Sequence, residues 1–285
     1  MISKAQFEKE LTVIISNAIR EDVGDGDHTS NACIPADAQG KAKLLVKEAG
    51  IIAGVAFAKQ VFAYVDADLV VTTFLNDGDN VQVGDVVFHV SGKSRSILMA
   101  ERLVLNAMQR MSAIATKTAF FVGLLAGTKT KILDTRKTTP GIRALEKWAV
   151  KIGGGENHRF ALYDMMMIKD NHIDFAGGVS QAIKKARQYL IAKKIDIKII
   201  VEARNLQEIK EILLNEGVYR ILIDNFNYED TKKAVALIGT TCLTESSGGI
   251  NEKTIRKYAE CGVDFISSGA LTHAVQNLDL SLKAI

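Results

Sequence analysis

The stretch Asp134–His172, DTRKTTPGIRALEKWAVKIGGGENHRFALYDMMMIKDNH, contains the pattern from which the fold can be predicted. The apolar runs Lys131–Leu133, just before it, and Met165–Ile168, near its end, are typical of buried strands, and Ile142–Val150 between them has a helical pattern. This is a strand–helix–strand unit whose strand ends carry cations. Because ligands bind at the carboxyl ends of parallel strands, the sequence predicts a pocket for a substrate with several negative charges.

The same theme of apolar run, polar turn and amphipathic helix repeats toward the end of the chain. Further strands are expected at Ile197–Val201, Ile221–Ile223, Thr241–Leu243 and Asp264–Ile266. Helices are expected at Val179–Leu190, Leu206–Leu214, Tyr228–Ile238 and Glu252–Cys261. Strands in this rhythm imply right-handed crossovers and a parallel sheet, and no Rossmann fingerprint follows the first of them. We therefore expect a closed or nearly closed α/β barrel.

The first third of the chain has a different pattern. A helix is expected at Phe7–Arg20, and strands are expected at Lys41–Lys47, Ile51–Ala53, Leu69–Leu75 and Val86–Ser91. Ile97–Leu125 is typical of one long buried or interfacial helix, and its charged residues argue against a membrane span. We expect an α+β domain over residues 1–116 and a barrel domain over residues 117–273, with residues 274–285 packing back on the first domain.

Composition narrows the class of protein. The chain has 285 residues, of which 47% are hydrophobic and 24% charged, as in ordinary soluble globular enzymes. A net charge of +3 is too small to indicate nucleic-acid binding. The three cysteines are widely spaced without a metal-site pattern, which favours the reducing cytoplasm. The N-terminus contains acidic residues and no cleavage-site pattern, so we expect no signal peptide.

Cations follow several of the expected strands. A polar residue after a strand commonly caps the next helix, but a cation there is disfavoured by the helix dipole. We therefore interpret Arg136 and Arg159 as carboxylate clamps, with His158 beside them and Lys169 as a further point charge. For Lys137, a solvated surface position is an open alternative.

Two carboxylates and two Gly/Ser turns complete the candidate site. Glu202 and Asp224 end successive strands, so they could hold a magnesium ion that carries a pyrophosphate, or they could balance the buried cations. Both interpretations stay open. The turns Ser246–Gly249 and Ser267–Ala270 lead into helices, and their backbone N–H groups could cradle a phosphate monoester.

Long motifs in a fixed order extend over nearly the whole chain. They are EDVGDGDHTS (Glu21–Ser30), AERLVLNAMQRMSAIAT (Ala100–Thr116), DTRKTTPGIRALEKWAV (Asp134–Val150), GGGENHR (Gly153–Arg159), LYDMMMIKDNHI (Leu162–Ile173), IDN (Ile223–Asn225), ESSGGI (Glu245–Ile250) and SSGALTH (Ser267–His273). With these motifs the chain resembles the quinolinate phosphoribosyltransferases, also called nicotinate-nucleotide pyrophosphorylases (carboxylating). The resemblance implies an N-terminal open-sandwich domain and an incomplete α/β barrel of the type II phosphoribosyltransferase kind, in a homodimer.

The resemblance also implies roles for individual residues. The residues that it implies bind quinolinate are Arg136, His158, Arg159, Lys169 and, from the partner subunit, Arg102. The implied catalytic residues, serving phosphoribosyl pyrophosphate and Mg²⁺, are Lys137, Glu202 and Asp224, and the two carboxylates would be the metal ligands. The residues that it implies line the phosphate end are Ser247, Gly248, Gly249, Gly269 and His273.

The implied reaction joins quinolinate to phosphoribosyl pyrophosphate and gives nicotinate mononucleotide, pyrophosphate and carbon dioxide, in de novo NAD biosynthesis. Two other functions remain possible: a related barrel transferase for another base such as nicotinate, or a non-catalytic ligand-binding paralogue.

The chain departs from the family pattern at two places. The strand before Asn205 often reads acid-x-acid-x-acid in the family, but here the three positions are Ile200, Glu202 and Arg204. Alternation keeps these three on one face of the strand, so we expect a leaner metal site. Ala113 replaces a common glycine, which we expect to change packing only.

Overall fold

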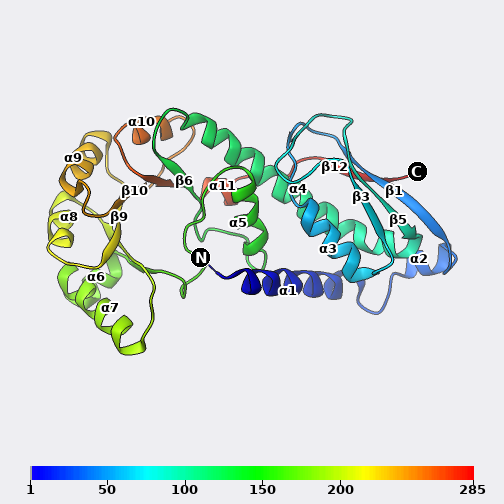
Figure 1. Cartoon of the computed structure of the whole chain (residues 1–285), viewed down its shortest axis with the longest axis horizontal. Coiled ribbons are helices and arrows are strands. Elements are labelled where there is room, and N and C mark those ends of the chain that lie inside the picture. The colour runs from blue at the N-terminus through cyan, green and yellow to red at the C-terminus, as the bar shows by residue number, and fades with distance from the viewer. Residues whose placement is uncertain (1) are drawn as a thin grey trace. The chain divides into compact units, whose positions relative to one another are not determined.

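The computed structural model describes residues 2–285 and divides into two compact units (Figure 1). One unit consists mainly of Phe120–Lys137 and Gly155–Ala270. The other consists mainly of Ser3–Ala119, Thr138–Gly154 and Leu271–Ile285. The domain limits expected from the sequence stay a prediction, and Met1, where the first of those domains begins, lies outside the described residues.

The first unit is built on a six-stranded parallel sheet. Its strands are β6 (Lys131–Leu133), β7 (Met166–Ile168), β8 (Ile199–Ala203), β9 (Val218–Asp224), β10 (Leu243–Ser247) and β11 (Phe265–Ser267). Their order is β6-β11-β10-β9-β8-β7, and every neighbouring pair is parallel. Within residues 2–285, β6 and β7 are the outermost strands of this order and do not pair with each other, so the predicted incomplete α/β barrel is confirmed.

The helices of this unit follow successive strands. They are α6 (Asp170–Ala176), α7 (Val179–Lys193), α8 (Leu206–Leu213), α9 (Tyr228–Ile238) and α10 (Ile255–Ala259). Figure 1 shows α7, α8 and α9 along the outer side of the sheet. Asn205 and Asn227 are the N-caps of α8 and α9, and each side chain accepts a backbone N–H from the first turn. Every residue of β8 is buried, as expected of a central strand under helices.

One predicted strand was wrong. We expected Thr241–Leu243, but β10 begins at Leu243 and continues to Ser247. Glu245 therefore lies inside the strand instead of after it. A rule based on apolar runs ends a strand at the first charged residue. Here the charge is tolerated because Arg220 of β9 donates to the Glu245 carboxylate at 2.6 Å.

The second unit combines helices with an antiparallel sheet. Its helices are α1 (Lys4–Val23), α2 (His28–Cys33), α3 (Val55–Val65), α5 (Arg143–Ile152), most of α4 (Ser94–Leu124) and most of α11 (Ala270–His273). Its strands are β1 (Gln39–Val46), β2 (Gly50–Ile51), β3 (Val70–Thr73), β4 (Asn80–Val81), β5 (Val86–Lys93) and β12 (Leu280–Ala284).

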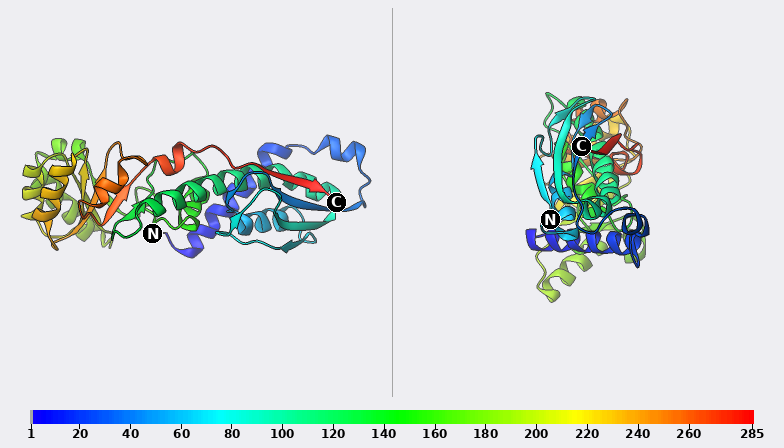
Figure 2. Two further views of the ribbon diagram at one scale, coloured as in Figure 1. Left: turned by 90° about the horizontal axis from the view of Figure 1, so that it is seen from above. Right: turned by 90° about the vertical axis from the view of Figure 1, so that its right-hand side faces the viewer.

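The main sheet of this unit has the order β12-β1-β5-β3 and is antiparallel throughout. Its apolar face packs on α3, where the rings of Phe62 and Phe88 meet edge to face at 5.8 Å. Helix α4 packs close to Gly54, the residue before α3. A Cβ atom on Gly54 would lie only 3.1 Å from side-chain atoms of Met108 and Met111 on α4. Figure 2 shows α4 as one long continuous helix. In residues 2–285, no helix combines the length and the apolar character that crossing a bilayer requires.

Candidate active site at the carboxyl ends of the parallel strands

Glu202 lies at the carboxyl end of β8, in contact with a lysine from the neighbouring strand end. It is mostly buried, and Lys169, which follows β7, donates to its Oε2 at 3.1 Å. Burial raises the pKa of Glu202, Lys169 opposes this rise, and the nearby charges of Asp224 and Asp170 add to it. The carboxylate is therefore stabilised by any further cation at this position.

Asp224, the last residue of β9, is held by two side-chain donors. Ser247 Oγ donates to its Oδ1 at 2.5 Å, and Asn225 Nδ2 donates to its Oδ2 at 2.6 Å. The backbone N–H of Asn225 also donates to the Ser247 carbonyl at 3.0 Å. These bonds join the ends of β9 and β10, so the IDN and ESSGGI motifs form one structure.

Gly248 is required by this junction. Its φ is +93°, and a Cβ atom there would lie 2.1 Å from Oδ1 of Asn225, which leaves no room for any side chain. Gly249 also has a positive φ of +60°, but no atom would lie within 4 Å of its Cβ. The turn after β10 thus brings bare backbone close to Asn225, the neighbour of Asp224, and such backbone is a suitable surface for a phosphate group.

The second Gly/Ser turn, after β11, packs against the first. The Ser268 hydroxyl donates to the Ile250 carbonyl at 3.4 Å, and the Ser268 N–H donates to the Leu133 carbonyl at 3.0 Å. Gly269 is half-buried beside them. The structure thereby brings Ser247, Gly248, Gly249 and Gly269 into one region of the first unit.

A fully buried carboxylate, Glu245, lies within β10 and contacts two groups. Arg220 Nη1 donates to its Oε2 at 2.6 Å, and His158 Nε2 lies 3.3 Å from the same oxygen. Burial alone would raise the pKa of Glu245, but His158 and Arg220 outweigh it and lower the pKa to about 2. Its two partners therefore favour the ionised form of Glu245.

His158 is held from both sides of its ring. Its Nδ1 accepts the backbone N–H of Arg159 at 2.6 Å, so the proton is on Nε2, which faces Glu245. Asp134, buried after β6, accepts the His158 backbone N–H at 2.8 Å and the Asn157 amide at 2.6 Å. Both contacts fix the segment that carries Arg159.

The charges of Arg159 and Arg136 act on each other. Arg159 is largely buried, and its Nη1 donates to the Met165 carbonyl at 3.3 Å. Burial, assisted by the charge of Arg136, lowers the pKa of Arg159, while Asp164 opposes this effect. Two guanidinium groups that repel each other are stabilised by an anion that binds both. Arg136 and Lys137 are exposed, so their side chains are accessible to such a ligand.

Two predicted site residues belong to the other unit. Arg102 is exposed on α4, and His273 is exposed at the end of α11. Their part in the site stays a prediction.

Two carboxylates are available for a metal ion. No group of three or more His, Cys, Asp or Glu side chains in residues 2–285 is arranged to hold one. Mg²⁺ commonly uses one or two carboxylates and completes its shell with substrate phosphates and water, so Glu202 and Asp224 fit that kind of site. Their mutual repulsion, which raises the pKa of Glu202, would be relieved by the ion.

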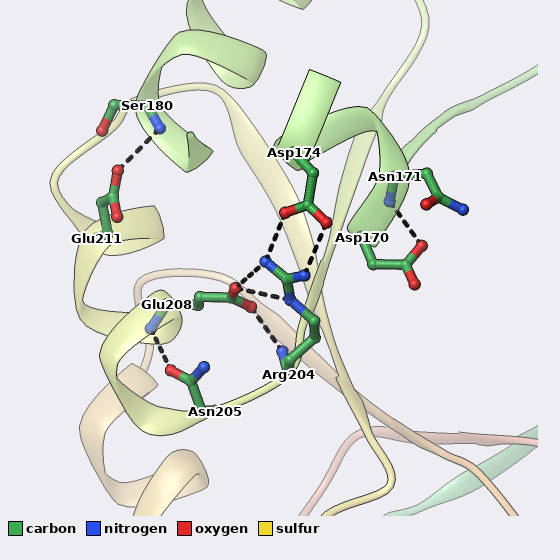
Figure 3. A network of polar contacts seen from close by, with 8 residues as sticks. All are labelled: Asp170, Asn171, Asp174, Ser180, Arg204, Asn205, Glu208 and Glu211. Carbon is green, nitrogen blue, oxygen red and sulfur yellow. Dashed lines mark hydrogen bonds and ion pairs between the residues drawn. The ribbon is translucent and has the colours of Figure 1, made fainter. Parts of the chain in front are cut away.

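Sequence reasoning missed two arginines near the site. Arg220 lies buried in β9 over the ring of Phe265, at 4.2 Å from the ring centre. An arginine inside an apolar run implies a buried partner, which is the signal that could have revealed it. Arg204 was noted only as a departure from the family pattern, but it contacts Asp174 and Glu208 (Figure 3).

Comparison with protein families gives two matches that together extend over most of the chain. The model of the quinolinate phosphoribosyl transferase N-terminal domain matches residues 27–112. The model of the C-terminal domain of the same enzyme matches residues 114–283.

Individual relatives agree with these matches. A mitochondrial quinolinate phosphoribosyltransferase (decarboxylating) of Nicotiana tabacum is 46% identical over 96% of this chain and 82% of its own length. A probable nicotinate-nucleotide pyrophosphorylase (carboxylating) of Bacillus subtilis is 40% identical over 96% of this chain and 93% of its own length. The solved nicotinate-nucleotide pyrophosphorylase of Francisella tularensis superposes with a TM-score of 0.89, at 36% identity over 97% of this chain and 96% of that protein.

Proposed function

The chain belongs to the quinolinate phosphoribosyltransferase family, and we propose that its strand-end site joins quinolinate to phosphoribosyl pyrophosphate. The products are nicotinate mononucleotide, pyrophosphate and carbon dioxide, a step of de novo NAD synthesis. The observation that carries the proposal is the set of cations that follow the parallel strands: the charge of Arg136 acts on the buried Arg159, and Lys169, which follows β7, contacts Glu202. Quinolinate has two adjacent carboxylates, which match two guanidinium forks and an ammonium group better than one carboxylate does.

The roles divide between the two substrates. In this proposal quinolinate binds to Arg136, Arg159 and Lys169, with His158 beside them. Phosphoribosyl pyrophosphate is bound by Lys137, Glu202 and Asp224, and its phosphate monoester by the turn residues Ser247, Gly248, Gly249 and Gly269 together with His273. Glu202 and Asp224 would hold Mg²⁺, which when bound neutralises the pyrophosphate and makes it a better leaving group.

The chemistry needs no nucleophilic side chain. The ring nitrogen of quinolinate forms a bond to the anomeric carbon as the bond from that carbon to pyrophosphate breaks. In this proposal Glu202 or Asp224 stabilises the positive charge that develops on the ribose, and the cations orient the ring. The carboxylate next to the nitrogen then leaves as carbon dioxide. Its electron pair is taken up by the positively charged ring, and a proton replaces it.

We further propose that the enzyme is a homodimer in which Arg102 serves the partner's site. The exposed position of Arg102 on α4 is compatible with a role outside its own subunit. The reducing cytoplasm is the proposed compartment, supported by the three cysteines, which are all free thiols.

The decisive experiment supplies quinolinate, phosphoribosyl pyrophosphate and Mg²⁺ and measures carbon dioxide and nicotinate mononucleotide. Nicotinate in place of quinolinate is the control for base choice. Turnover of nicotinate in preference to quinolinate would assign the chain to the other base. Binding of quinolinate without pyrophosphate release would identify a non-catalytic paralogue.

A further inference from the structure

Helix α6 is short and weakly anchored, although it begins immediately after Lys169. It has seven residues, of which only Ile173 is buried, and Phe175 is 90% exposed. A helix of this length is not stable by itself in water, so contacts with the rest of the protein must hold it. Gly177 and Gly178, with φ of +92° and +123°, end it and add no side chain that could anchor it.

Arg204 provides such a contact (Figure 3). Its Nη1 and Nη2 donate to the two carboxylate oxygens of Asp174 on α6, at 3.1 and 3.0 Å. Its Nε donates to Glu208 Oε1 at 2.8 Å, and its backbone N–H donates to Glu208 Oε2 at 2.7 Å. One guanidinium therefore binds two carboxylates in fixed geometry, which separates this network from an ordinary exposed ion pair.

Glu208, the second carboxylate that Arg204 binds, is itself held in place. Asn205 caps α8, and its Oδ1 accepts the Glu208 N–H at 2.9 Å. Arg204 follows directly after β8. The position of Asp174 is thus tied to the end of the strand that carries Glu202.

The first turn of α6 contains the groups that surround Glu202. The Lys169 N–H donates to His172 Nδ1 at 3.1 Å, and Lys169 Nζ donates to Glu202 Oε2 at 3.1 Å. The charge of Asp170 also acts on Glu202. Asp174 lies one helical turn after Asp170, so a contact that holds Asp174 also holds this first turn.

We propose that Arg204 is a positioning residue: through Asp174 and helix α6, it keeps Lys169 beside Glu202, with its ammonium group placed for a substrate carboxylate. The inference rests on the proposed function for the identity of that substrate.

The test compares Arg204→Met and Asp174→Asn with a matched surface pair. Lys233→Met is the control, because Lys233 and Asp230 form an exposed ion pair of 3.0 Å on α9. Isothermal titration should show quinolinate affinity weakened by about 2- to 30-fold in both test variants, the range for residues that act on a bound ligand without contacting it. The KM for phosphoribosyl pyrophosphate should change less than the quinolinate affinity, because Glu202 itself stays in β8. The double variant should be no weaker than the weaker single variant, because both changes break the same contact.

Amide hydrogen exchange of residues 169–177 tests the structural step without any substrate. Arg204→Met should exchange faster there, and Lys233→Met should match the wild type. Arg204→Lys, which keeps the charge but loses the fork, should lie between them. The inference is overturned if residues 169–177 of Arg204→Met exchange at the wild-type rate. It is also overturned if quinolinate affinity is unchanged in both test variants. Failure of the wild-type protein to bind quinolinate overturns the proposed function instead, while faster exchange would still support the contact.

Discussion

Glu245 Oε2 lies 3.3 Å from His158 Nε2, and both side chains are buried. The same oxygen accepts from Arg220 at 2.6 Å. The carboxylate therefore neutralises a charge in the sheet and orients the histidine that precedes Arg159. Loss of the carboxylate should affect both the fold and the binding of the substrate anion.

We expect Glu245→Gln to lower the free energy of unfolding by about 3–5 kcal/mol at pH 7, since it leaves the Arg220 charge buried without its partner. Urea denaturation of the purified variant measures this. A double variant that also carries Arg220→Met should recover part of the loss, because the unpaired charge is removed as well. If the double variant loses as much unfolding free energy as Glu245→Gln alone, packing and not charge is responsible.

The same pair predicts how stability depends on pH. The folded-state pKa of Glu245, about 2, lies below the ordinary value of 4.5. Its contribution is therefore present above the ordinary value and is lost as the pH falls from there toward 2. The unfolding free energy of the wild type should decrease over this range more steeply than that of Glu245→Gln. Parallel curves for the two proteins would contradict the assignment.

Arg136→Ala and Arg159→Ala should each weaken quinolinate binding by about 2–5 kcal/mol, the cost of truncating one member of a desolvated charge pair. Stability should change less, because each variant removes the repulsion between the two guanidinium groups. Titration calorimetry and thermal unfolding of both variants check the two halves of the prediction. Unchanged affinity in either variant would exclude that arginine from the site.

Helices with a clear periodic pattern were predicted from the sequence, and helices without one were not. Tyr228–Ile238 was predicted with the bounds of α9, because it has a helical pattern and Gly239 follows it. Helix α6 was not predicted, because a helix with one buried residue has no amphipathic pattern to recognise. Its presence depends on tertiary contacts, including that between Arg204 and Asp174.

The candidate site shows the same division. Lys169 and Glu202 were both predicted from their positions at strand ends, and the structure brings them to 3.1 Å. That Arg220 is the partner of Glu245 could not be predicted, because it depends on the register between β9 and β10. This register sets Glu245 opposite Leu222, two residues after Arg220 on β9. Local patterns therefore predicted which residues gather at the strand ends, but not which of them neutralise one another.

Removal of Mg²⁺ by a chelator should abolish activity, and added Mg²⁺ should restore it. Asp224→Asn should raise the KM for phosphoribosyl pyrophosphate with little effect on quinolinate affinity, because this carboxylate is assigned to the metal and pyrophosphate. Steady-state kinetics with each substrate varied in turn, at fixed Mg²⁺, distinguish the two effects. Full activity in the presence of the chelator would mean that Glu202 and Asp224 only balance the neighbouring cations.

The last prediction is that the active site is shared between subunits. Arg102 is exposed on α4, in the unit that does not carry the parallel strands. If it acts in the partner's site, Arg102→Ala and Arg159→Ala homodimers should both be poor enzymes. Co-expression of differently tagged subunits should then give heterodimers with one intact site, formed by the parallel-sheet unit of the Arg102→Ala subunit and Arg102 of the other.

Such heterodimers should recover up to about half of the wild-type kcat, because one site of two is complete. A mixture of the two separately purified homodimers, assayed before subunits exchange, is the control and should stay inactive. Heterodimers without recovered activity would mean that Arg102 serves its own subunit or lies outside the site. An Arg102→Ala homodimer with wild-type kinetics would remove Arg102 from the mechanism altogether.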